Sequence, residues 1–112
     1  MQADSSPHER RREHRLPIDL FVNRFVNGYP YLCVAMDISR SGIRLQPLLE
    51  PTSAPALFMG LQFQLPGSPE IVTASGEAVC IDEDAGLVGV RFTRLPPASA
   101  AVIERFLAQR DS

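Results

Sequence analysis

The chain has 112 residues, 45% of them hydrophobic and 21% charged, a composition typical of one small globular domain and not of a disordered protein. Its formal net charge of −2 at pH 7 argues against general binding to nucleic-acid polymers or to anionic membrane surfaces. No apolar run approaches the roughly 18 to 20 residues of a membrane-spanning helix, so insertion into a membrane is not expected.

The N-terminal segment is polar and carries the sequence ERRREHR at residues 9–15, with four arginines in seven positions. We expect residues 1–9 to form a flexible tail. The segment lacks the apolar core of a secretory signal, which indicates a cytoplasmic protein. Arginine offers a planar fork of donors that suits phosphate oxygens and the guanine edge. The same residues are also compatible with a solvated basic tail or with an RNA-binding tail.

A β-hairpin is predicted after this segment, with strands at residues 17–26 and 30–39. Asn27 and Gly28 lie between the two apolar runs, and both residue types tolerate the positive φ that a tight hairpin turn requires. Side chains alternate across a strand, so the second strand should have a core face and an outer face. The predicted core face holds Leu32, Val34, Met36 and Ile38, and the predicted outer face holds Tyr31, Cys33, Ala35, Asp37 and Ser39.

Four more strands are predicted at residues 42–47, 58–65, 70–81 and 87–95, separated by a proline-rich loop at 47–57 and by turns at 66–69 and 82–86. In the first of them Ile43 and Leu45 should point inward. Ser75 and Gly76 are candidates for a β-bulge in the third.

The C-terminal segment changes character. Pro96 and Pro97 favour a helix start, and a helix is expected at about residues 97–109. Its apolar stripe consists of Val102, Ile103, Phe106 and Leu107.

The six strands and the helix together predict a mainly β fold. We expect a six-stranded antiparallel β-barrel at about residues 16–95 with a C-terminal α-helix, in one domain at 10–112.

No catalytic or metal-binding constellation is evident. Cys33 and Cys80 each lie in an apolar stretch, so both are expected to be buried, reduced thiols and not a disulfide or a metal site. His8 and His14 lie in the polar tail without a nucleophile at a meaningful spacing. A non-enzymatic protein without cofactor or metal is expected.

The sequence DISRSG at residues 37–42 suits guanine binding. A carboxylate such as that of Asp37 accepts hydrogen bonds from the N1–H and N2–H₂ edge of guanine, and the hydroxyl of Ser39 can bond a phosphate or a base. Gly42 permits a positive φ or the close approach of a ligand. The alternative is a purely structural turn that ends a strand.

Taken together, Arg11-x-x-x-Arg15 followed after 21 residues by Asp37-x-Ser39-x-x-Gly42 resembles the PilZ domain family. The segments RLPIDLFV, VAMDISRSGIRL and GLVGVRFTRL also look like that family's strands, in its order, over about residues 9–109. The resemblance implies a receptor for the bacterial second messenger cyclic di-GMP. It implies that the arginines fold over the ligand and that the second motif holds a guanine on the outer surface of the barrel.

The resemblance carries further expectations. Arg10 directly precedes the arginine pair, and in PilZ-like proteins an arginine there tends to accompany an intercalated ligand dimer, so two cyclic di-GMP molecules per chain are expected. A monomer that signals to an unidentified protein effector through ordering of the arginine segment is expected. The alternatives are a protein-interaction adaptor that binds no nucleotide and a barrel for single-stranded nucleic acid. The last needs exposed aromatic side chains, which the alternation here places mostly in the core.

Overall fold

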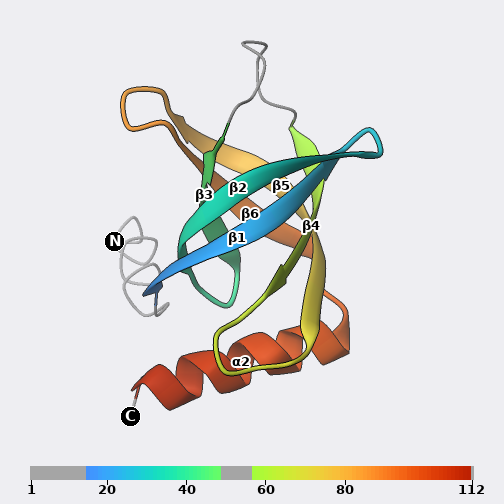
Figure 1. Ribbon diagram of the computed structural model, residues 1–112, viewed down its shortest axis with the longest axis vertical. Helices are drawn as coiled ribbons and strands as arrows, with labels where there is room; N and C mark the ends of the chain where they lie inside the picture. Colours follow the sequence, from blue (N-terminus) through green and yellow to red (C-terminus); the bar gives the residue numbers. More distant parts are fainter. Residues whose placement is uncertain (1–14, 49–56, 112) are drawn as a thin grey trace, which may run out of the picture.

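The computed structural model describes residues 15–48 and 57–111. Its elements are β1 (Leu16–Val26), β2 (Tyr29–Ile38), β3 (Gly42–Pro47), β4 (Phe58–Gln64), β5 (Ile71–Asp82), β6 (Leu87–Arg94) and α2 (Pro97–Asp111). The strands form a closed barrel in the order β1-β2-β3-β6-β5-β4, and all six neighbouring pairs are antiparallel. The predicted six-stranded antiparallel barrel with one C-terminal helix is confirmed (Figure 1).

The hairpin between β1 and β2 turns where the sequence predicts. Asn27 and Gly28 have φ values of 52° and 83°, and Val26 pairs directly with Tyr29 across the turn. A two-residue turn with positive φ at both positions matches the right-handed twist of the flanking strands, which explains why Asn-Gly occurs there.

The helix α2 lies across one end of the barrel (Figure 1). Its predicted stripe is buried and joins the core formed by the inward side chains of the strands. The helix is also attached to β5 by a hydrogen bond, because the backbone N–H of Thr73 donates to Oγ of the buried Ser99 at 3.0 Å. Pro97 opens the helix, where its missing N–H costs no intrahelical bond.

The core-facing side of β2 is the opposite of the predicted one. Cys33 and Ala35 are fully buried, whereas Leu32 and Met36 are exposed. The physical reason is a β-bulge. The pairing of β2 with β3 shifts at Met36, which changes the alternation along the strand and leaves Ile38 buried as predicted.

Two further expectations about burial are wrong. Cys33 is buried as predicted, but Cys80 is exposed because it lies on the outer face of β5, paired with Gly89 of β6. The aromatic side chains do not gather in the core either. Phe63 and Phe106 are buried, whereas Phe21 and Tyr29 are among those that are exposed.

The candidate bulge at Ser75 and Gly76 is only partly right. The pairing of β5 with β6 shifts there, but the extra residue is Thr93 of β6, and the bulge of β5 itself lies at Val79. A Cβ atom on Gly76 would overlap the side chain of Val90 in the core, so only glycine fits there. Ile43 and Leu45 of β3 point inward as predicted.

Candidate ligand-binding site

Asp37 lies between two arginines at the end of β2. Nη1 of Arg15 donates to its Oδ1 at 2.7 Å, and Nε of Arg44 donates to its Oδ2 at 2.6 Å. The Asp37 side chain is 9% exposed, whereas those of Arg15 and Arg44 are 48% and 49% exposed. The carboxylate is therefore covered by its two cations, each of which still faces solvent with about half of its surface.

Strand pairing brings these three residues together. Asp37 pairs with Arg44 of β3 on one side and with Pro17 of β1 on the other, and Arg15 immediately precedes β1. The bulge at Met36 turns Asp37 toward the outside of the barrel, where Arg44 also points. The expectation that Asp37 belongs to the outer surface is correct in direction, but its carboxylate is covered and not freely exposed.

Ser39 does not project from the surface as predicted, because it is fully buried in the turn between β2 and β3. Its N–H donates to the carbonyl oxygen of Gly42 at 2.9 Å, and its Oγ accepts from the N–H of Ser41 at 3.3 Å. A Cβ atom on Gly42 would overlap the carbonyl oxygen of Val90. In this geometry both motif residues shape the turn that holds Asp37 in place.

A cleft of about 580 Å³ lies beside Asp37 on the outside of β3, β5 and β6. Three arginines contribute to it: Arg15, Arg44 and Arg91. The rest of the lining includes the apolar residues Val79 and Leu87, the backbone of Gly42 and Gly89, and one acidic residue, Asp82. This volume lies within the range of about 300 to 1,000 Å³ of small-molecule sites. The combination suits a ligand that carries both anionic groups and flat apolar faces.

Sequence reasoning missed Arg44 and Arg91. Their outward direction could have been predicted, because each alternates with inward residues on its own strand. Their proximity to Asp37 and to the cleft could not, because it depends on how β3 pairs with β2 and β6. Arg10 and Arg11, which are also predicted site residues, lie outside the described residues, as does the predicted flexible tail.

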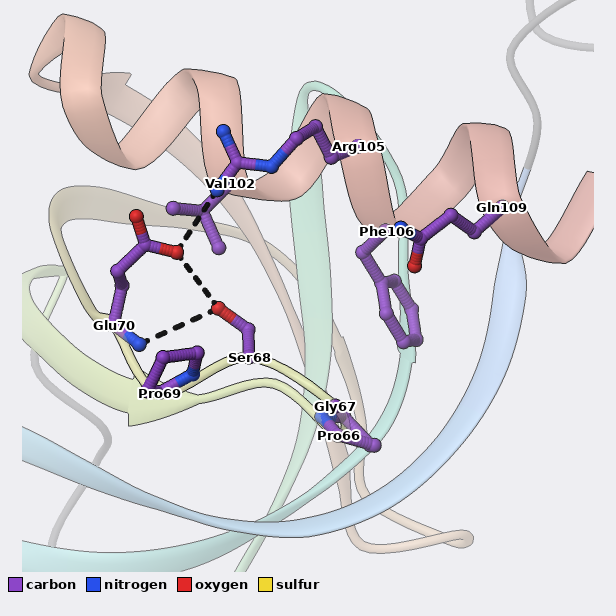
Figure 2. Close-up of a pocket in the computed structure, with 9 residues that line it drawn as sticks. All are labelled: Pro66, Gly67, Ser68, Pro69, Glu70, Val102, Arg105, Phe106 and Gln109. Atoms are coloured by element: carbon purple, nitrogen blue, oxygen red, sulfur yellow. Dashed lines mark hydrogen bonds and ion pairs between the residues drawn. The ribbon is translucent and has the colours of Figure 1, made fainter.

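A second, smaller pocket of about 230 Å³ lies between the β4–β5 turn and α2, at the end of the barrel that the helix covers (Figure 2). Its two charged side chains, Glu70 and Arg105, bond each other at 2.9 Å, and Ser68 also donates to Glu70 at 3.0 Å. None of the predicted site residues lines it. The cleft beside Asp37 is therefore the better candidate.

The chain matches a known protein family over most of its length. The family model described as the PilZ domain matches residues 9–109. The chain belongs to the PilZ domain family. PilZ domains are a ligand-binding receptor fold and are not typically catalytic. No curated protein matches the sequence.

Solved PilZ-domain structures share the fold at low sequence identity. The inhibitor of motility MotI/DgrA of Bacillus subtilis has a TM-score of 0.70 and 12% identity, over 88% of this chain and 50% of that chain. The PilZ domain of CeSA from a cellulose-synthesizing bacterium has a TM-score of 0.65 and 16% identity, over 88% and 99%. The PlzA protein of Borreliella burgdorferi, solved in complex with cyclic di-GMP, has a TM-score of 0.62 and 17% identity, over 94% and 44%. This chain thus spans about half the length of MotI/DgrA and of PlzA.

Residues 15–48 and 57–111 contain no group of three or more histidine, cysteine or acidic side chains placed to hold a metal ion. Over the same ranges, no helix has the length and apolar character to cross a membrane.

Proposed function

We propose that this PilZ domain is a non-enzymatic, cytoplasmic receptor for cyclic di-GMP. The observation that carries the proposal is the carboxylate of Asp37, which Arg15 and Arg44 hold at the edge of a cleft of about 580 Å³. Guanine presents two donors to a carboxylate, and each phosphate presents oxygens to a guanidinium. Both complementary groups lie side by side at this one place.

Each predicted residue has a role in the proposal. Asp37 accepts hydrogen bonds from the N1–H and N2–H₂ edge of a guanine. Arg15, together with Arg10 and Arg11, binds the phosphates and stacks on a base. Ser39 and Gly42 maintain the turn that fixes Asp37, and the backbone of Gly42 borders the ligand. Both oxygens of Asp37 already accept from an arginine, Oδ1 from Arg15 and Oδ2 from Arg44, so binding requires the ligand to share or replace these bonds.

The signal is proposed to pass to a protein effector through the N-terminal arginine segment, which becomes ordered over the bound ligand. Ordering the segment costs about 1–2 kcal/mol for each fixed residue, which the charge-assisted hydrogen bonds to phosphate must exceed.

The second candidate function is an adaptor that contacts a partner without nucleotide. The exposed Phe21 and Leu32 on the outer face of β1 and β2 favour it, because clustered exposed apolar side chains mark contact surfaces.

Calorimetric titration of the whole chain with cyclic di-GMP tests the proposal, and cyclic di-AMP is the matched control. Adenine lacks the N1–H and N2–H₂ donors that Asp37 would bind, so only the guanine ligand should release heat on binding. Absence of binding to cyclic di-GMP would overturn the receptor function and leave the adaptor. Equal affinity for both ligands would show that Asp37 does not recognise guanine.

A further inference from the structure

At Gly89, backbone alone forms the floor of the cleft. On the outer face of the barrel Cys80 of β5 pairs with Gly89 of β6, Gly89 pairs with Arg44 of β3, and Arg44 pairs with Asp37 of β2. Neighbouring strands lie about 4.8 Å apart, so Cys80 and Arg44 stand about 10 Å apart across bare backbone. Directly opposed residues point to the same face, and Gly89 leaves a hollow in this row.

Backbone conformation does not explain the glycine at this position. The described glycines with positive φ are Gly28, Gly67 and Gly86, and Gly89 is not one of them. A glycine inside a strand costs about 0.5–1 kcal/mol relative to alanine, and one common reason for it is the close approach of another group to the backbone. A Cβ atom on Gly89 would lie 3.3 Å from Cβ of Cys80, a tight contact within the hollow itself.

The surroundings of the hollow define what it can hold. Val79, which is 58% exposed, and Leu87 offer apolar surface on its β5–β6 side, where Asp82 of β5 adds one carboxylate to the lining of the cleft. Arg44 lies on the opposite side of the hollow. Arg91 lies one row away, where it pairs with Gly42 across the strands and forms an ion pair with Glu77. A thin group with apolar faces fits against the first side, and an anionic group fits against the second.

We propose that the hollow over Gly89 is a subsite for a planar base, with Arg44 binding the adjoining phosphate. The inference rests on the proposed function and adds to it two residues that belong to neither motif. Gly89 sets the depth of the subsite. Arg44 differs from the arginines of the N-terminal segment because a barrel strand fixes it, so its charge is in place before the ligand arrives.

The thiol of Cys80 provides a direct test, because it is exposed at the border of the hollow whereas Cys33 is buried. The rate of alkylation of Cys80 by iodoacetamide is measured on the whole chain with and without cyclic di-GMP. At a free ligand concentration of about ten times Kd, only about a tenth of the sites stay empty, so alkylation should slow about tenfold. Inorganic phosphate, which can occupy the arginines but not the hollow, should leave the rate unchanged.

The matched control is a chain with Cys80→Ser and Gln62→Cys. Gln62 is exposed on the outer face of β4, which stands opposite β3 in the order of the barrel. The introduced thiol should react equally fast with and without cyclic di-GMP. Protection at both positions would overturn the subsite, because it would reflect a general change in reactivity.

Calorimetry on the same samples distinguishes failure of the subsite from failure of the proposed receptor function. Ligand binding with unprotected Cys80 overturns the subsite and leaves the proposed function. Absence of binding overturns both. Substitution of two glycines provides a second test. Gly89→Leu should weaken binding at least about tenfold, because its side chain would fill the hollow. Gly60→Leu adds a side chain on the outer face of β4 and should leave the affinity unchanged. Equal affinity of a folded Gly89→Leu chain and the unaltered chain also counts against the subsite.

Discussion

At the scale of single residues, the decisive feature is the unequal exposure of Asp37 and its two partners. The carboxylate is 9% exposed, and its arginines are about half exposed. A buried charge that loses a partner is costly, whereas an arginine that loses one can still be solvated. Substitution of the acid and substitution of a base should therefore affect stability differently.

Asp37→Ala and Arg15→Ala should each weaken the binding of cyclic di-GMP while the fold remains. The loss of one charge-assisted partner costs about 1.5–3 kcal/mol, which is about ten- to a hundredfold in affinity. Calorimetry gives the affinity, and circular dichroism verifies the fold. Glu70→Ala and Arg105→Ala remove an ion pair of the same chemistry beside α2 and are the matched controls. Unchanged affinity in both site variants would disprove the assignment.

Arg44→Leu should destabilise the fold by about 1–3 kcal/mol, because it leaves Oδ2 of a covered carboxylate without its donor. Arg91→Leu is the comparison and should cost at most about 1 kcal/mol, since both partners of its pair with Glu77 are more exposed. Urea unfolding measures both free energies. Adding Asp37→Asn to Arg44→Leu should recover part of the loss, since the uncompensated charge is then gone. Equal losses for Arg44→Leu and Arg91→Leu would contradict this account.

At the scale of elements, the bulge in β2 links the core to the site. It lets Ala35 and Ile38 both face inward and turns Asp37 toward Arg44. The following turn is tightened by the bonds of Ser39 with Ser41 and Gly42. Asp37, Ser39 and Gly42 are thus joined in one strand end and turn. In the proposed site, the N-terminal arginines would supply the groups that precede the barrel.

The N-terminal arginine segment should become more ordered when the ligand binds. We expect NMR relaxation of the amides from Arg10 to Arg15 to change toward slower internal motion on addition of cyclic di-GMP, because each arginine that binds phosphate loses rotational freedom. Amides of α2, which lies across the end of the barrel, serve as the internal reference. Identical relaxation with and without ligand would exclude the ordering mechanism but not the binding.

At the scale of the whole molecule, the arginines of the proposed site come from two parts of the chain. Arg44 and Arg91 lie on barrel strands, whereas Arg10, Arg11 and Arg15 precede β1. The lining of the cleft contains Arg15, Arg44 and Arg91 together with one acidic residue, Asp82. The chain as a whole has a formal charge of −2, so general attraction of anions to its entire surface is not expected.

Two cyclic di-GMP molecules should bind per chain, because an intercalated dimer has twice the phosphates of one molecule and the chain has Arg10 in addition to the predicted pair. The subsite over Gly89 would provide room for a second base. Calorimetry at protein concentrations well above Kd measures the ratio. Arg10→Leu should lower it toward one without abolishing binding, and Arg110→Leu on the exposed end of α2 is the control. A ratio of one for the unaltered chain would refute the prediction.

The sequence by itself determined the elements and the outline of the site. Alternation of period two, Asn27-Gly28 and the proline pair before α2 are local signals, and local signals suffice to place six strands and a helix. The family motifs likewise selected Asp37 and Arg15, which the structure brings together.

Only the tertiary structure decided which face of β2 is buried, where Cys80 lies, and that Arg44 covers Asp37. The inward face depends on a bulge, which cannot be inferred from one strand alone. The exposure of Cys80 depends on the register of β5 with β6, which pairs it with Gly89 on the outer face. The cleft over Gly89 exists because β5, β6 and β3 pair in a particular register, and register joins residues that are far apart in the chain.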